Sequence, residues 1–309
     1  MPDVGIIGLG PHWETRYRPV LQKMRNRVRV RAIHDPVFSR AETAAAELEC
    51  DASQGVLTLL RRPDIRAVLI LDYNWQVPLA LRYACDLGKP LYLGGKISQQ
   101  ISALQQIHHA VTDRGIEVMP EFPRRYAPST ARLKELLVTR LGKVKQLLIT
   151  TSKAPAELAH EALIGLADWC QYLIGGTPEI VRRRQRSAQE IMEIQFRPSK
   201  TESSPVSARI QLELCDQTSA PGVDGECHYQ AEIQCEHGSA WIKSPQDLSW
   251  KNGTDAQNER LTSERQDVEV MLDHFCRRVV GGLIPVPSLE DACRAVKWLE
   301  IPAEQDPAG

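Results

Sequence analysis

The sequence lacks an excess of charge of either sign, because 38 lysines and arginines face 39 aspartates and glutamates. That balance gives no overall field that would attract nucleic acid or an anionic membrane. The sequence also lacks an apolar run near the roughly 20 residues that a membrane-spanning helix needs. Its N-terminus has no basic segment of the kind that begins a signal peptide. We therefore expect a cytoplasmic protein with neither a nucleic-acid partner nor a membrane partner.

Paired metal-ligand motifs are missing as well, since the eight cysteines contain no CxxC. In a reducing compartment they are expected to behave as small buried hydrophobes. Cys227, His228, Cys235 and His237 lie close enough in sequence to suggest zinc. Segment 227–235, however, alternates apolar and polar residues as a half-buried strand does, which sends Cys227 and His228 to opposite faces. Zinc ligands must converge, so we expect no metal site.

With 309 residues, 42% of them hydrophobic, the chain is long enough for about two domains with real cores. The first 120 residues alternate strands with helices, the strands being predicted at 4–9, 28–33, 67–71, 91–93 and 116–119. Such alternation predicts an α/β domain with a parallel, doubly wound sheet. After residue 120, helices at 129–139 and 157–174 mix with strands of alternating apolar and polar residues, such as 206–215. This pattern predicts a second α/β domain, 121–309, with an open and mainly antiparallel sheet that has one polar face.

A glycine-rich turn follows the first predicted strand. Gly8 permits a tight turn, and Gly10 lets the backbone approach a pyrophosphate at the start of the next helix. Asp35 follows the second strand, where a carboxylate either accepts hydrogen bonds from an adenosine ribose or forms a plain Asp-Pro turn. Trp13 stands where a third glycine would fall. Its indole would crowd the pyrophosphate, hold strand and helix apart, or pack without meeting a ligand.

Eight segments in order resemble the Gfo/Idh/MocA oxidoreductases, the family of glucose-fructose oxidoreductase and inositol dehydrogenase. The segments are 4–10, 35–42, 63–68, 73–74, 84–90, 124–134, 173–178 and 275–292. The resemblance covers nearly the whole chain and implies a Rossmann domain that binds NAD or NADP. It also implies that Asn74, in the segment similar to the family's "PN", contacts the cofactor. Asp35 favours NAD, because a carboxylate repels the 2′-phosphate of NADP, although His34 and Arg40 could soften that effect.

The resemblance further implies a substrate with a sugar- or cyclitol-like hydroxyl. A lysine and a histidine, assisted by an aspartate, would manage the hydroxyl proton. It also implies a homo-oligomer formed through the polar face of the open sheet. Arg124 and Tyr126, in a segment similar to the family's "RRF", either contact the substrate or support the domain junction.

The match breaks where the family carries its chemistry. Its Glu-Lys-Pro segment reads Gly94-Gly95-Lys96 here, so the catalytic lysine position holds Gly95. Lys96 reaches the cleft if the two glycines remodel the turn, and otherwise it is a solvated surface lysine.

The predicted helix 157–174 breaks the match a second time. Gly165 takes the place of the family's histidine and Glu161 that of its aspartate. Glu161 and Asp168 lie on one face of this helix. If that face lines the cleft, they act as acid or base. Otherwise they only cap the helix and interact with solvent. His160 is adjacent but about 100° away around the helix. Two functions remain open: an NAD(P)-dependent oxidoreductase, or a catalytically inactive relative that binds a nucleotide or sugar or acts as a scaffold.

Overall fold

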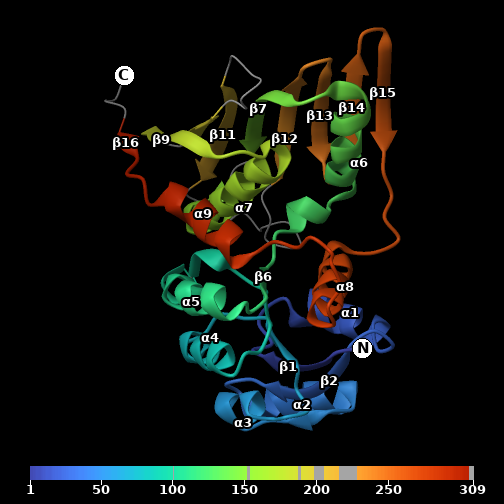
Figure 1. Ribbon diagram of the computed structural model, residues 1–309, viewed down its shortest axis with the longest axis vertical. Coiled ribbons are helices and arrows are strands. Elements are labelled where there is room, and N and C mark those ends of the chain that lie inside the picture. The colour runs from blue at the N-terminus through green and yellow to red at the C-terminus, as the bar shows by residue number, and fades with distance from the viewer. Residues whose placement is uncertain (100, 152–153, 187–188, 198–204, 216–227, 306–309) are drawn as a thin grey trace. The chain divides into compact units, whose positions relative to one another are not determined.

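The computed structural model describes residues 1–99, 101–151, 154–186, 189–197, 205–215 and 228–305. The chain forms two compact units (Figure 1). Unit 1 comprises residues 1–123 and 265–293, and unit 2 comprises residues 124–264 and 294–309. The first crossing between units, after Pro123, lies close to the boundary expected at residue 120. Residues 265–293 differ from the expectation, because the sequence pattern places them in the second domain whereas they cluster with unit 1.

Unit 1 is built on a parallel sheet with strand order β3-β2-β1-β4-β5-β6. This is the Rossmann order, and it confirms the predicted doubly wound sheet. The strands are β1 (Asp3–Ile7), β2 (Arg29–His34), β3 (Asp51–Ala52), β4 (Ala67–Ile70), β5 (Leu91–Leu93) and β6 (Val118–Pro120). The helices are η1 (Trp13–Tyr17), α1 (Arg18–Lys23), α2 (Phe38–Leu48), α3 (Val56–Leu60), α4 (Val77–Asp86), η2 (Ile97–Gln99), α5 (Ile101–Arg114) and α8 (Asp267–Val279).

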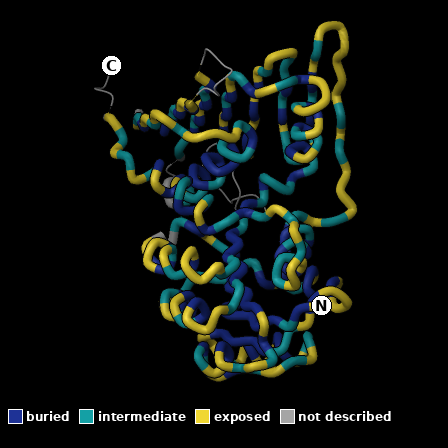
Figure 2. The backbone as a smooth tube through the Cα atoms, in the orientation of Figure 1, coloured by how far each residue is buried: buried dark blue, intermediate teal, exposed yellow. Residues whose placement is uncertain are grey.

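The core of unit 1 lies on the central strands. All four residues of β4 are buried, as a run of Ala, Val, Leu and Ile predicts for a strand covered on both faces. In Figure 2 these strands are dark blue, while the outer turns of the surrounding helices are exposed. The strand order reverses between β1 and β4, and ligands of open α/β sheets bind beyond the carboxyl ends of the strands at such a point.

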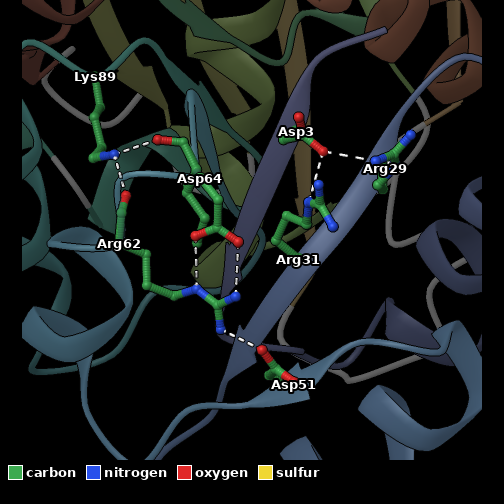
Figure 3. A network of polar contacts seen from close by, with 8 residues as sticks. Asp3, Arg29, Arg31, Asp51, Arg62, Asp64 and Lys89 are labelled. Carbon is green, nitrogen blue, oxygen red and sulfur yellow. Dashed lines mark hydrogen bonds and ion pairs between the residues drawn. The ribbon is translucent and has the colours of Figure 1, made fainter.

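The amino ends of the same strands carry a network of ion pairs (Figure 3). Arg62 pairs with Asp51 at 2.5 Å and with Asp64 at 2.8 Å, and Asp3 pairs with Arg31 at 2.7 Å. The ion pairs with Arg62 hold the pKa of Asp64 below its usual range. These charges tie the loops before β3 and β4 to each other at the edge opposite the switch point.

Helix α8 belongs to unit 1 although it follows most of unit 2 in sequence. It packs beside α1, where Lys23 pairs with Glu269 at 2.7 Å. Deeper in the unit, the Phe275 ring lies 5.6 Å from the Tyr92 ring of β5. Phe275 is fully buried, so α8 completes the core of unit 1 and does not merely touch its surface.

Unit 2 contains a second sheet with strand order β15-β14-β13-β12-β7-β11-β10-β9-β16, and a short strand, β8, pairs with β11. Most neighbouring pairs are antiparallel, which confirms the predicted open, mainly antiparallel sheet. The strands are β7 (Val144–Thr151), β8 (Ala154–Pro155), β9 (Pro178–Arg186), β10 (Gln189–Phe196), β11 (Val206–Cys215), β12 (Tyr229–Cys235), β13 (Ser239–Ser244), β14 (Asp247–Asn252), β15 (Asp255–Arg260) and β16 (Glu304–Gln305). The helices are η3 (Pro123–Tyr126), α6 (Pro128–Leu136), η4 (Leu137–Leu141) and α7 (Ala156–Ile174), and α9 (Leu289–Leu299) spans the third crossing between the units, after residue 293.

Among the described residues, helices cover one face of this sheet. Helix α7 crosses β7 and β11, and α6 lies against β13 and β14 (Figure 1). The strands alternate accordingly: in β12, Tyr229, Ala231 and Ile233 are buried and the residues between them are exposed. The edge strand β15 is exposed along nearly its whole length (Figure 2). The other face of the sheet is therefore polar, as the period-2 pattern of the sequence predicts.

Candidate functional site

The turn after β1 places both predicted glycines at the switch point of the parallel sheet. Gly8 and Gly10 have φ angles of 75° and 59°, in the left-handed region that favours glycine. A Cβ atom at these positions would lie 3.0 Å and 2.9 Å from Cβ of Asp72. Any other residue would therefore be strained and crowded, and the bare backbone of the turn is what close approach to a phosphate requires.

Asp35 connects this turn to the end of β2. Its Oδ2 accepts a hydrogen bond from the Leu9 amide at 3.0 Å, and its Oδ1 accepts one from the Val37 amide at 2.9 Å. Arg40 lies 3.8 Å from the same carboxylate and donates to the Gly10 carbonyl at 3.4 Å. Asp35 is 2% exposed, so it fixes the turn, and the bond to Val37 matches the Asp-Pro turn that the sequence also predicts.

Two polar residues follow β4 at the same edge. Asn74 Oδ1 accepts a hydrogen bond from the Gln76 amide at 2.9 Å, whereas its buried Nδ2 finds no acceptor among the described residues. Asp72 lies against the glycine turn, and burial, together with the charge of Asp35, raises the pKa of its carboxyl group. Sequence reasoning missed Asp72, although a carboxylate directly after a fully apolar strand at the switch point was a sufficient signal.

Trp13 lies shortly after the glycine turn in sequence. It opens η1, a π-helical turn, and its side chain is only 3% exposed. A buried indole agrees with the packing role that the sequence leaves open.

The segment after β5 holds the two glycines that replace the family's Glu-Lys. A Cβ at Gly94 would overlap the hydroxyl of Tyr17, and this hydroxyl donates to Glu121 Oε1 at 3.0 Å. Burial raises the pKa of both Tyr17 and Glu121. Gly95 has a φ of 76°, and a Cβ there would make only ordinary contacts, the nearest being 3.7 Å from the Leu71 carbonyl oxygen, while Lys96 is exposed. The Tyr17 hydroxyl therefore occupies the space that a side chain at position 94 would need.

In unit 2, Gly165 lies in the middle of α7 with the guanidinium of Arg124 beside it. A Cβ on Gly165 would be 2.6 Å from Arg124 Nη1. Arg124 is 8% exposed, and its guanidinium carbon lies 5.1 Å from the centre of the Tyr229 ring. The space that a side chain at position 165 would need is therefore taken by a buried cation.

The neighbouring residues of η3 and α7 form an ion pair. Arg125 donates to both carboxylate oxygens of Asp168, at 2.8 Å and 2.5 Å, and Asp168 is 2% exposed. This arrangement ties Asp168 to Arg125 and favours a structural role over the predicted proton transfer. Glu161 is half-buried one turn before Gly165. Tyr126 is also half-buried, and burial raises the pKa of its phenol.

The described part of the chain contains no group of three or more His, Cys, Asp and Glu residues placed to hold a metal ion. Cys227, part of the cluster weighed in the sequence, lies outside the described residues, and Cys235 is an unbridged cysteine of β12. Within the described residues, no helix combines the length and apolar character that crossing a bilayer requires.

Comparison with solved structures identifies the fold. UDP-N-acetylglucosamine 3-dehydrogenase GnnA from Acidithiobacillus ferrooxidans is 16% identical, and the match covers 97% of this chain and 96% of that chain with a TM-score of 0.75. Levoglucosan dehydrogenase, in complex with NADH and levoglucosan, is 15% identical over 95% of this chain and 94% of that chain, with a TM-score of 0.77. The chain has the Gfo/Idh/MocA fold. A variant of KijD10, a 3-ketoreductase from Actinomadura kijaniata in complex with TDP-benzene and NADP, gives 16% identity, 99% coverage of both chains and a TM-score of 0.74.

No family model matches the chain, and no curated protein matches its sequence significantly. The Gfo/Idh/MocA fold nevertheless extends over both units, as the resemblance read from the sequence predicts. Within that fold, unit 1 brings Gly8, Gly10, Asp35 and Asn74 to one edge of the parallel sheet. Unit 2 brings Arg124 to Gly165 and Arg125 to Asp168.

Proposed function

We propose that the protein is an NAD(P)-dependent oxidoreductase that acts on a sugar- or cyclitol-like hydroxyl and binds NAD in preference to NADP. The observation that carries the proposal is the switch-point edge of unit 1. There, two glycines with positive φ leave the backbone bare, and the buried Asn74 Nδ2 has no acceptor among the described residues. An orphaned buried donor indicates a missing acceptor, and a dinucleotide supplies several.

The residues present therefore fit the cofactor. Gly8, Gly10 and Asn74 would hold its phosphates and neighbouring groups, and Asp35 would orient the ribose while disfavouring a 2′-phosphate. When bound, the nicotinamide would take the hydride from the carbon that bears the hydroxyl. The hydroxyl proton needs a base, for which we propose Lys96 or Glu161. Neither the Arg125 partner Asp168 nor the buried Trp13 suits that role, because both side chains are withdrawn from solvent.

Titration of the purified protein with NAD, NADH, NADP and NADPH by calorimetry tests the proposal. Micromolar affinity for NAD or NADH, with weaker binding of the phosphorylated pair, is the expected result. Absence of binding at millimolar concentrations of all four would refute the dehydrogenase function. If a substrate screen then reveals turnover, Lys96→Ala distinguishes the two proposed bases. A lowered kcat would assign the proton transfer to Lys96, whereas an unchanged kcat would leave Glu161 as the proposed base.

A second candidate function is a catalytically inactive protein that binds a nucleotide or sugar or serves as a scaffold. It is favoured by Gly95 and Gly165, which remove the family's two proton-transfer side chains. Nucleotide binding without turnover of any polyol would support it.

On either function we propose a homo-oligomer formed through the polar face of the second sheet, which light scattering after size-exclusion chromatography would test.

A further inference from the structure

Arg124 is a buried cation that has no counter-charge among the residues that the structure describes. Its side chain lies within unit 2 over the face of the Tyr229 ring, and the residue is 8% exposed. Its buried Nε has no hydrogen-bond acceptor, and no carboxylate among the described residues lies within ion-pair distance. Its neighbour Arg125 shows the contrast, because it is neutralised by two hydrogen bonds to Asp168. A buried charge normally requires a partner, since desolvation is costly.

Gly165 gives the Arg124 guanidinium its place against α7. A single carbon added at Gly165 would come within 2.6 Å of Nη1. A mid-helix glycine costs about 1 kcal/mol relative to alanine, so α7 gives up stability at the position that makes space for this cation. The glycine and the cation thus belong to one arrangement.

A second unsatisfied polar group lies on the same face of the sheet. Thr151 is directly opposite Tyr229 in the ladder between β7 and β12, and directly opposite residues project to the same side. Thr151 is buried, and its hydroxyl has no hydrogen-bond partner among the described residues. The buried guanidinium lies over the Tyr229 ring, and the buried hydroxyl belongs to the residue opposite Tyr229 in the ladder. An oxyanion accepts hydrogen bonds from both kinds of group.

We propose that Arg124, with the Thr151 hydroxyl, binds an oxyanion carried by the substrate, so that the substrate is an acidic sugar rather than a neutral one. This inference rests on the proposed function for the sugar-like body of the ligand. The planar fork of arginine suits carboxylate and phosphate alike, so both a sugar carboxylate and a sugar phosphate carry the required group.

Calorimetric titration of the full-length protein with glucuronate, glucose 6-phosphate and glucose tests the proposal. We expect at least one of the two anions to bind about tenfold to a hundredfold more tightly than glucose, as a charge-assisted hydrogen bond predicts. The better of the two anions identifies the source of the charge. Equal affinity for all three sugars, or binding of none, would overturn the proposal.

Two variants and one control assign the effect to Arg124. Arg124→Gln should abolish the preference for the anion, and without ligand it should unfold at a temperature no lower than the parent protein. Gly165→Ala should retain stability while displacing the guanidinium, and it should weaken anion binding by a similar factor. It therefore keeps the test valid even if Arg124→Gln fails to fold. Arg182→Gln, at an exposed arginine of β9, should change nothing. Undiminished anion preference in Gly165→Ala and Arg124→Gln would refute the assignment.

The same titrations, repeated with and without NAD, separate this inference from the proposed function. Anion preference without any nucleotide binding would refute the dehydrogenase but keep the Arg124 site. Nucleotide binding without anion preference would refute the Arg124 site and keep the proposed dehydrogenase.

Discussion

At the level of single residues, Gly94 and Gly165 do more than leave out a side chain. At Gly94 and at Gly165 the room that a side chain would need is taken by a polar group from elsewhere in the same unit, the Tyr17 hydroxyl in one case and the Arg124 guanidinium in the other. Gly95 is different, because a Cβ there would make only ordinary van der Waals contacts and its φ is 76°. Restoring the family's lysine there would meet a strained backbone rather than a steric clash.

Asp72 is the residue whose charge most directly opposes the proposed cofactor. An ionised carboxylate against the glycine turn repels a pyrophosphate, so Asp72→Asn should tighten NAD binding by about tenfold, equivalent to about 1.4 kcal/mol. Calorimetry of Asp72→Asn measures this, with Asp113→Asn, an exposed aspartate of α5, as the control. Weaker binding by Asp72→Asn would show that the carboxylate is used as an acceptor.

The raised pKa of Asp72 also predicts a pH dependence. Because burial favours its neutral form, the carboxyl takes up a proton at a higher pH than an ordinary aspartate, and the repulsion disappears as the pH falls through that value. NAD affinity should therefore rise toward acidic pH in the parent protein and stay flatter in Asp72→Asn. A pH series of the same titrations measures the difference, and parallel profiles would contradict the role of Asp72.

Gly94→Ala should destabilise the protein by about 1–3 kcal/mol, as overpacking of a core does. The new methyl would meet the Tyr17 hydroxyl, which is held by Glu121 and cannot move aside freely. Tyr17→Phe removes that hydroxyl, so the double variant should lose less stability than the sum of the two single losses. Chemical denaturation of all four proteins completes the cycle, and strict additivity would rule out the contact.

At the level of secondary-structure elements, the Arg125–Asp168 pair joins η3 to α7. Asp168→Asn removes the carboxylate charge from this buried ion pair and should lower the free energy of unfolding by about 3 kcal/mol. If Asp168 is structural, the variant keeps the pH profile of any catalysed reaction. A profile that loses one ionisation with stability unchanged would instead restore the predicted acid–base role.

Much of this level could be predicted from the sequence. Strand 67–71 and the glycine turn were predictable because apolar runs and turn glycines are local signals, and β11 was predicted with its observed bounds, 206–215. The guanidinium beside Gly165 was not predictable, since it depends on how η3 and α7 pack against each other. Trp13 shows the same limit: its position in the sequence favours a ligand contact and a packing role equally, and only tertiary structure shows that the indole is buried.

At the level of the whole molecule, the chain leaves unit 1 at residue 123 and returns to it for residues 265–293. The predicted boundary missed this return, because periodicity gives the helix 267–280 its apolar stripe but not the identity of the core that covers it. The returning helix brings Phe275 to Tyr92 and Glu269 to Lys23. It also brings Arg278 to Glu117 at 2.6 Å. A folded unit 1 therefore needs two distant parts of the chain.

The dependence on α8 predicts how fragments behave. Residues 1–123 alone would expose the apolar surface that Phe275, Met271 and Leu272 cover, so this fragment should show no cooperative thermal unfolding and rapid proteolysis. A fusion of 1–123 to 265–293 through a flexible linker should unfold cooperatively, because the missing core face is restored at the cost of loop closure, which grows only slowly with length. Calorimetric scans of the two fragments compare them directly. A fusion that carries Phe275→Ala serves as the control, expected to lose about 3–5 kcal/mol. Cooperative unfolding of 1–123 by itself would show that the Rossmann sheet is complete without α8.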